Sequence, residues 1–347
     1  MDVQIINPLE DERWDDLVAR HPHASAFHQR GWLEALARTY GYKPFVLTTT
    51  PLGRPLQNGL VLCSVNSWIS GKRLVSLPFT DHCDPLLEGP EQFEGFADWL
   101  CSECDSKSYR YAELRPRTQP VPPSMEPGQS YWLHELDLSA TLSDLFDRLH
   151  KDSIQRKIRR ADKESLSYEV GNSEELLEEF YGLLLITRRR HQLLPQPRTW
   201  FGNLRHCLGD NLQIRVARKD GKPVAAMLTL RHRATIIYKY GCSDERFHRL
   251  GGMPFLFWKL IEESKSGGAE TIDYGRSDLD HDGLIAFKDK FGARKRKLLY
   301  CRYSNPQVKE VKAKAKSWDS RIIRRIFEFL PDEAMSIGGR ILYRHMG

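Results

Sequence analysis

Three charged side chains cluster at the end of a short predicted strand. Residues 270–274 favour a β-strand that follows two glycines, and the pattern breaks at Gly275. Asp273, Arg276 and Asp278 therefore lie at a strand end, which is where α/β folds place chemistry. A carboxylate in this position could act as a general base or bind an amine, and the guanidinium could hold a substrate.

A short basic helix is predicted directly after this cluster. Residues 282–291 carry apolar side chains and Lys288 at helical spacing, and the pattern stops at Gly292. Four basic residues follow at positions 294–297. A basic cradle beside a carboxylate cluster suits a ligand that bears phosphate.

The same region resembles a known family. Its letters DYGRSD and GLIAFKDKFGA resemble the C-terminal signature of the FemAB-like and BioF2-like acyltransferases, a branch of the GNAT superfamily. Residues 21–36, 74–87 and 153–161 resemble further parts of the family pattern, so the likeness extends to about Tyr303. The resemblance implies transfer of an acyl or aminoacyl group to an amine.

The order of the predicted elements agrees with this resemblance. Two helices, three meandering strands, and then alternating helices and strands occur roughly twice, with long helices expected at 142–162 and 173–191. The expected fold is α+β, with tandem GNAT-like domains that each hold a mixed, mostly antiparallel sheet flanked by helices. The proline-rich residues 116–129 predict a loop or linker. The predicted domains are 1–140, 141–303 with the donor site, and a basic amphipathic tail at 304–347.

Composition restricts the compartment and the partners. The 347 residues are 40% hydrophobic and 28% charged, an ordinary balance for a soluble protein. No run approaches the roughly 18 to 20 apolar residues that a membrane span needs, and the N-terminus is acidic where a signal peptide would be basic. We therefore expect a cytoplasmic protein. The net charge of +6 is small for a general nucleic-acid binder.

Cysteine spacing predicts no metal site. The seven cysteines are odd in number and scattered, as reduced core thiols are. Cys101 and Cys104 have ligand spacing, but no second pair of Cys or His lies at a matching interval to complete a zinc site.

The resemblance places a donor site at residues 242–252. In GNAT enzymes the turn before this helix binds the pyrophosphate of acyl-CoA through main-chain amides, since a helix N-terminus concentrates free N–H donors. Arg246, Arg249, Gly251 and Gly252 are the expected cofactor-binding residues. Arg249 stands where the family pattern has its first glycine, so a plain loop remains an alternative. Acetyl-CoA or a longer acyl-CoA is the expected donor, and aminoacyl-tRNA, as in some relatives, is the alternative.

The resemblance also implies catalytic roles. Asp273 and Asp278 are expected as general base or as ligands of the acceptor amine, and Tyr240 as a proton donor to the leaving group. Main-chain amides are expected to stabilise the oxyanion where the central strands splay. Lys288 matches the family lysine that is linked to holding donor phosphate. A solvated helix face is the alternative for Lys288.

Acceptor-binding residues are expected in two places. His82, with Asp81 beside it, lies at a predicted strand end of the first domain and could serve as a base or ligand. Arg156, Lys157 and Arg160 lie on a basic helix and could grip a diphosphate of the acceptor. The alternatives are a structural His–Asp pair and an exposed basic surface.

These expectations combine into a predicted function. The chain is expected to acylate an amine of a small-molecule or lipid-linked amino sugar or peptide precursor in cell-envelope polysaccharide or exopolysaccharide synthesis. The alternatives are a FemX-type transferase that takes aminoacyl-tRNA to a peptidoglycan precursor, with tRNA as partner, and a non-catalytic membrane-associated assembly factor. The basic stripe at 306–330 could contact an anionic membrane or dock on its own protein. The oligomeric state is left open.

Overall fold

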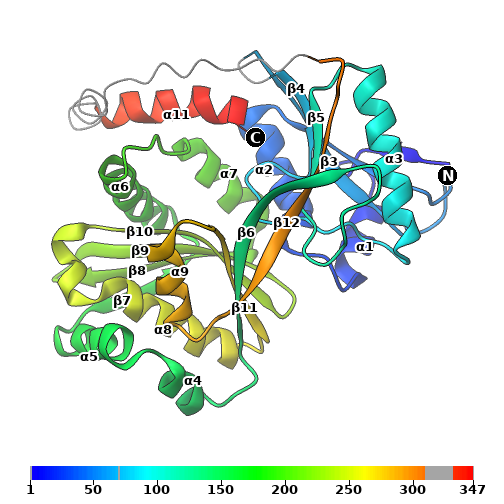
Figure 1. Cartoon of the computed structure of the whole chain (residues 1–347). Coiled ribbons are helices and arrows are strands. Elements are labelled where there is room, and N and C mark those ends of the chain that lie inside the picture. Colours follow the sequence, from blue (N-terminus) through cyan, green and yellow to red (C-terminus); the bar gives the residue numbers. More distant parts are fainter. Residues whose placement is uncertain (1, 69–70, 309–330, 347) are drawn as a thin grey trace. The chain divides into compact units, whose positions relative to one another are not determined.

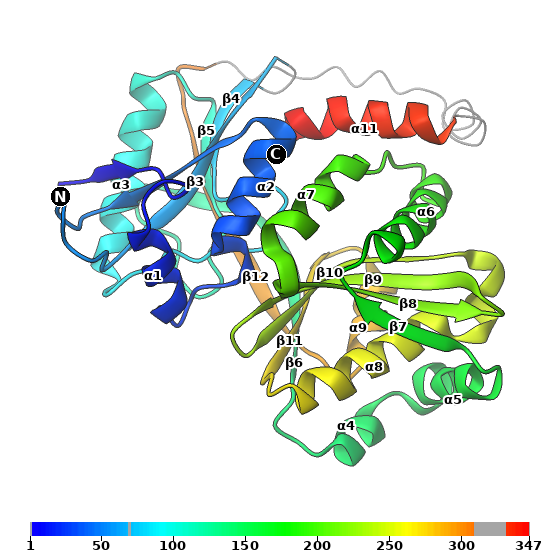
Figure 2. The ribbon, with the colours of Figure 1, turned by 180° about the vertical axis from the view of Figure 1, so that it is seen from behind.

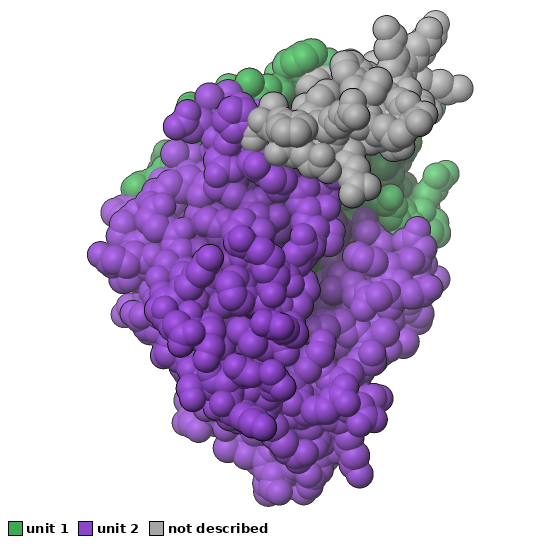
Figure 3. Space-filling model, turned by 90° about the vertical axis from the view of Figure 1, so that its left-hand side faces the viewer, with its two compact units in different colours: residues 1–130, 298–316, 340–347 green, residues 131–297, 317–339 purple. Residues whose placement is uncertain are grey.

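The chain is described as two compact units. The computed structural model describes residues 2–68, 71–308 and 331–346 (Figure 1). The first unit holds the described residues of 1–130, 298–316 and 340–347, and the second holds those of 131–297 and 317–339 (Figure 3). The basic stripe predicted at 306–330 falls almost wholly outside the described residues, and helix α11 (Asp332–Met346) follows it. None of the described helices is long and apolar enough to cross a bilayer.

The first unit is a mixed sheet flanked by helices. β4 pairs with β5 in parallel, and its other described pairings are antiparallel. The strand order is β1 (Gln4–Ile6), β2 (Lys43–Thr48), β3 (Leu60–Ser67), β4 (Gly71–Val75), β5 (Tyr111–Leu114) and β12 (Arg294–Ser304). The helices are α1 (Arg13–Arg20), α2 (Arg30–Tyr40) and α3 (Glu91–Ser106).

Aromatic side chains build the core of the first unit. Phe93 and Phe96 of α3 pack in one cluster with Leu62 and Leu74 of the sheet. Trp14 of α1 is fully buried, and its indole N–H donates to a main-chain carbonyl at 3.0 Å, which satisfies its one polar group.

The second unit has the same kind of sheet. β10 and β11 pair in parallel, and the other described pairings are antiparallel. Its strand order is β7 (Ser167–Gly171), β8 (Leu212–Lys219), β9 (Lys222–His232), β10 (Thr235–Ser243), β11 (Thr271–Asp278) and β6 (Glu126–Asp137). Its helices are α4 (Leu142–Arg148), α5 (Arg156–Lys163), α6 (Glu174–Arg190), α7 (Arg198–Leu208), α8 (Gly252–Ser266) and α9 (Asp282–Asp289).

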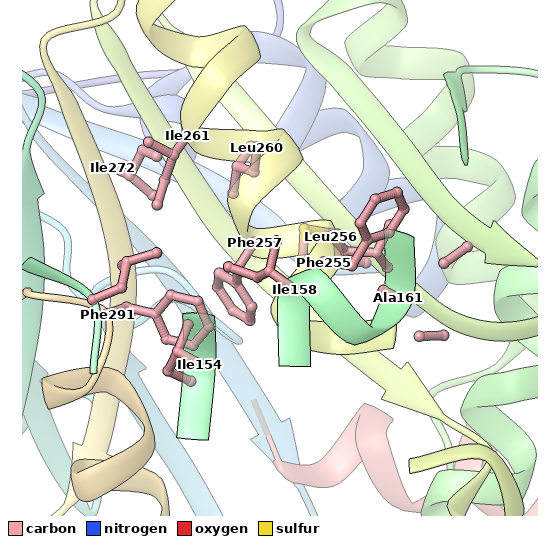
Figure 4. Close-up of a cluster of buried hydrophobic side chains, with 14 of the residues drawn as sticks. Ile154, Ile158, Ala161, Phe255, Leu256, Phe257, Leu260, Ile261, Ile272 and Phe291 are labelled. Carbon is pink, nitrogen blue, oxygen red and sulfur yellow. The ribbon is translucent and has the colours of Figure 1, made fainter. Parts of the chain in front are cut away.

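Helices cover both faces of this second sheet. α6 and α8 each contact β8, β9 and β10, and Figure 2 shows them on opposite faces. On the α8 face, Ile154 and Ile158 pack with Phe257, Leu260 and Phe291 in one buried cluster (Figure 4). This apolar layer packs α5 and the segment just after α9 against α8.

The two units repeat one topology. In each, a meander of antiparallel strands is followed by a parallel pair and then by one more antiparallel strand. The predicted α+β fold with tandem GNAT-like sheets is therefore confirmed. The last strand of each sheet comes from the other half of the sequence, because β6 pairs with β11 and β12 pairs with β5. The domain boundary predicted at residue 140 assigns β6 to the first domain and β12 to the second, whereas each strand pairs with a strand of the other predicted domain.

One predicted helix is not continuous, although most of its residues are helical. The helix expected over 142–162 is interrupted after α4, where Leu149 and His150 adopt extended backbone with ψ of 142° and 121°. The buried side chain of Gln155 donates to the carbonyls of Phe146 and Leu149, both at 3.0 Å. An amide side chain thus replaces the hydrogen bonds that a continuous helix would have formed.

Candidate active site

The central strands of the second sheet separate. β10 and β11 are paired at Thr235–Thr271, Ile236–Ile272 and Ile237–Asp273, and no later pair is recorded among the described residues. Both strands continue, β10 to Ser243 and β11 to Asp278. Beyond Ile237, β10 therefore has no ladder partner in β11 among the described residues, and the amide of its last residue, Ser243, donates to the Thr187 hydroxyl at 2.9 Å.

A cavity of about 540 Å³ lies beside this separated end of β10. Gly241, Cys242 and Ser243 of β10 line it, together with Gly252, Met253 and Pro254 at the start of α8. Tyr238, Leu284 and Phe287 give it an apolar part. Burial raises the pKa of the Cys242 thiol, which donates to the carbonyl of Phe180 at 3.4 Å, so we expect it to remain a thiol.

Two glycines allow α8 to begin against this cavity. Gly251 has a left-handed φ of 79°, and a Cβ there would overlap the carbonyl oxygen of Lys157. A Cβ on Gly252 would lie 2.9 Å from that of Ala225. The first hydrogen bond of α8 runs from the Phe255 amide to the Gly251 carbonyl at 3.0 Å, and the amides before it have no partner within the helix. The start of the helix can therefore receive an anion.

The rim of the cavity is cationic. No carboxylate is among the described residues that line it. The basic side chains that line it are Lys157, Arg190, His191, His248, His281 and Lys290. Of these, the sequence predicted only Lys157. The charge distribution suits an anionic ligand such as a phosphate.

The DYGRSD signature forms a β-bulge. Asp273 of β11 is opposite Glu135 and Arg276 is opposite Leu133, so Tyr274 and Gly275 together oppose one residue of β6. Gly275 has φ of 72° and donates its amide to the Asp273 carboxylate at 2.7 Å. Asp273 is 1% exposed, and this hydrogen bond holds its carboxylate against the main chain of the bulge.

Lys288 secures this bulge from α9. Its side chain is 4% exposed, and its ammonium donates to the carbonyls of Gly275 and Arg276, both at 2.9 Å. Burial and the nearby Lys288 charge lower the pKa of His134, which faces the bulge. The contact of Lys288 with donor phosphate stays a prediction.

Three other predicted residues lie outside the cavity lining. Tyr240 is buried, and its hydroxyl accepts from the Trp200 indole at 3.0 Å. The Arg276 guanidinium lies 4.1 Å from the centre of the Tyr131 ring. Asp278 is exposed at the end of β11, and its carbonyl accepts from the amide of the cavity-lining His281 at 3.1 Å.

The two predicted donor-site arginines are also exposed. Arg246 forms an ion pair with the buried carboxylate of Asp244 at 2.5 Å and borders a neighbouring hollow beside α6. Arg249 lies on the exposed side of the same 3₁₀ turn. The structure thus brings Gly252 to the cavity without these guanidinium groups.

The predicted acceptor residues of α5 are only partly at the cavity. Lys157 lines it, whereas Arg156 is exposed elsewhere on the helix. Arg160 forms an ion pair with Glu164 at 2.6 Å. Residue spacing alone did not show that, of these three side chains, only Lys157 lines the cavity.

The predicted His82 lies in the core of the first unit. It is 1% exposed and packs edge-on against Phe27, with ring centres 5.3 Å apart. The carbonyl of Asp81 accepts from the Tyr300 hydroxyl at 2.7 Å. Burial opposes ionisation of Asp84, but Arg117 and His82 hold its pKa below the ordinary value. These contacts place His82 in a buried charged network.

The first unit closes the edge that is open in the second. Beyond the paired ends of β4 and β5, the Ser76 amide donates to the Glu113 carbonyl at 2.8 Å, and the Cys83 amide donates to the Arg115 carbonyl at 2.7 Å. The Arg115 guanidinium binds the carbonyls of Leu77 and Thr80, both at 3.1 Å. The chain after β4 therefore fills the place where a donor would bind.

We predict one donor site per chain for this reason. Besides the closed edge, the carboxylate of Glu91 lies against Gly89 at the start of α3, the helix that corresponds in order to α8. A negative charge there disfavours a phosphate. Calorimetric titration with acyl-CoA should give about one ligand per chain. A stoichiometry of two would contradict the prediction.

The arrangement suits acyl transfer assisted by the main chain. An activated carbonyl held along β10 would face amides that can stabilise its oxyanion, and the imidazoles at the rim could accept a proton. Among the described residues, no group of three His, Cys, Asp or Glu side chains could hold a metal ion.

Comparisons with known proteins define the class. Residues 148–283 match the family model of the acetyltransferase (GNAT) domain, and a search of curated proteins gave no match. FemX shares 13% identity at a TM-score of 0.67, over 86% of this chain and 97% of that chain. L-PGS from Bacillus licheniformis shares 15% sequence identity at a TM-score of 0.57, and the match covers 99% of this chain and 100% of that chain. A tandem GNAT protein from the clavulanic acid biosynthesis pathway shares 12% sequence identity at a TM-score of 0.51, and the match covers 87% of this chain and 98% of that chain.

The family match and these folds agree with the site. The matched residues lie mostly in the second unit, where the strands separate and the cavity opens. The chain is therefore an acyltransferase whose second unit carries a GNAT acetyltransferase domain, and it shares its fold with tandem GNAT proteins.

Proposed function

We propose that this acyltransferase moves an acyl group from acyl-CoA to an amine of an amino sugar or peptide precursor of a cell-envelope polysaccharide. The supporting observation is the cavity at the separated end of β10, with free amides at the start of α8 and a cationic rim. The rim would bind the phosphates of the donor, and the apolar part near Tyr238 and Phe287 would receive its acyl group. We place this reaction in the cytoplasm.

Acceptor binding is proposed on the α9 side of the cavity. His281 and Lys290 line that side, and Asp278 lies three residues before His281 at the end of β11. The acceptor ammonium must lose a proton before it attacks, and either Asp278 or the His281 imidazole could take that proton. Asp273 and Lys288 would act as positioning residues through the bulge.

Aminoacyl-tRNA is the second candidate donor. The exposed basic side chains of Arg156, Arg160 and Lys163 continue the positive charge of α5 beyond the cavity, which suits a polyanion. The FemX-type alternative predicted from the sequence keeps such a donor in the proposal, and FemX shares the fold.

Donor titrations test the proposal. Acetyl-CoA, longer acyl-CoAs and aminoacyl-tRNA would be titrated into the full chain by calorimetry, and amine products would be identified by mass spectrometry. Failure of every donor to bind would favour a non-catalytic assembly factor.

In titrations with acyl-CoA, replacing Lys157 by alanine should weaken binding by about five- to tenfold, because a phosphate would lose a charged partner. Lys163→Ala is the matched control, since Lys163 is exposed on the same helix and does not line the cavity. Equal acyl-CoA affinity of the two variants would contradict the assignment of the cavity as the donor site.

A further inference from the structure

Four side chains from the end of α6, the end of β10 and the turn before α8 form one contiguous cluster at the cavity rim. The Arg190 guanidinium at the end of α6 lies 3.2 Å from Nε2 of His248 and 3.3 Å from Nε2 of His191. The Ser243 hydroxyl lies 2.9 Å from the same nitrogen of His248. All four residues line the cavity.

The contacts of Arg190 determine the protonation of both imidazoles. A guanidinium only donates hydrogen bonds, so each Nε2 must accept, and each imidazole is therefore neutral. Both histidines are exposed at the rim, where partial loss of hydration and the charge of Arg190 lower the pKa of each. Arg188 and His281 further lower the pKa of His191, and Lys157 lowers that of His248.

Two carboxylates act in the opposite direction. Glu245 raises the pKa of both histidines, and Asp244 raises that of His248. Asp244 is already paired with Arg246, and the net pKa of each imidazole remains below its ordinary value. The cluster thus holds unprotonated imidazoles beside an arginine in a cavity whose described lining has no carboxylate.

The main chain at this place offers few donors to an anion. Gly252 and Met253 supply free amides at the start of α8, while Pro254 has no N–H and Arg249 replaces a family glycine. A dianionic group would need further hydrogen-bond donors, which the neighbouring cluster can provide once its imidazoles are protonated.

We propose that Arg190, His191 and His248 form a proton-coupled clamp for a pyrophosphate diester of the donor. The arriving dianion accepts from the Arg190 guanidinium and the Ser243 hydroxyl, which frees both Nε2 atoms, and each imidazole takes up a solvent proton and donates to a phosphate oxygen. This inference rests on the proposed function only in that the donor carries a pyrophosphate.

The sign of the pH dependence follows from linkage. The anion raises the pKa of each histidine in the complex above its value in the free protein, so binding consumes protons. Affinity is therefore highest below the free-state pKa values and falls as pH rises through the bound-state values. Amides and arginine alone would give no such dependence in this range.

Dephospho-CoA is the probe, because its pyrophosphate diester keeps its charge throughout this range. Calorimetry on the full chain should show binding about tenfold tighter at about pH 6 than at about pH 8, with uptake of about one to two protons. Proton uptake is read from the difference in binding heat between two buffers of unequal ionisation enthalpy.

Variants separate the clamp from a general pH effect. His191→Asn with His248→Asn should remove most of the proton uptake and flatten the pH dependence, while His206→Asn, an exposed histidine on α7, should change neither. No binding, or equally tight binding at both pH values without proton uptake, would overturn the clamp.

Acyl-CoA turnover measured on the same samples distinguishes the two proposals. Proton-linked dephospho-CoA binding without any acyl transfer would retain the clamp and remove the proposed donor reaction. Acyl transfer with pH-independent binding would retain the reaction and remove the clamp.

Discussion

Replacing Lys288 by methionine should lower the free energy of unfolding by about 2–4 kcal/mol, although the substitution keeps the length of the side chain. The ammonium donates to the carbonyls of Gly275 and Arg276 inside the bulge of β11. Methionine has no donor, so two carbonyls in a buried region would lose a charged partner. Chemical denaturation followed by circular dichroism measures the effect.

Lys295→Met provides the control for this prediction. Lys295 pairs with Asp289 at 3.2 Å, but its side chain is 41% exposed, and such surface pairs contribute about 0–1 kcal/mol. Should Lys288→Met unfold like the wild type yet lose donor binding, its ammonium would contact the ligand. The role implied by the family signature would then replace the positioning role.

The signature residues could be found from sequence, but their contacts could not. Asp273, Gly275 and Lys288 stood out because charged residues surround a glycine at a strand end. Their contacts depend on the left-handed conformation of Gly275 and the register shift of β11 against β6. Neither is visible in residue spacing, because both are set by a strand from another part of the chain.

The cavity shows the same limit. Gly251 and Gly252 precede a predicted helix, which is a local signal, and the structure places them at its start. Arg190, His191 and His248 meet only because the end of α6 lies near the turn before α8. The basic run at the end of the helix predicted over 173–191 was the one local sign of such a site.

Local turn chemistry was predicted well, and nonlocal pairing was not. An Asp-Gly pair between two strand-like runs is a strong local hairpin signal, and the φ values of 51° and 76° at Asp220 and Gly221 fit such a turn between β8 and β9. The first residues of β6 lie within the proline-rich stretch expected as a loop, and most of the strand pairs with the distant β11. Alternation within a segment cannot reveal such a partner.

Replacing Gly251 by alanine should reduce donor affinity by more than about tenfold and lower the free energy of unfolding by about 2–4 kcal/mol. The left-handed φ of 79° accounts for about 1 kcal/mol of this loss. The remainder comes from overlap of the new Cβ with the Lys157 carbonyl, which forces α5 away from the start of α8. Acyl-CoA titration and chemical denaturation measure the two effects.

Gly268→Ala separates the two causes. Gly268 lies just beyond the other end of α8 with φ of 74°, and a Cβ there would meet nothing within 4 Å. This variant carries the same backbone cost of about 1 kcal/mol without the steric contact, so donor affinity should be unchanged. Equal losses of affinity in the two variants would mean that the close approach of α5 to α8 does not shape the donor site. A loss of donor affinity in Gly251→Ala alone would mean that donor binding depends on the close contact between the N-terminus of α8 and the basic helix α5, which only a glycine at this position allows.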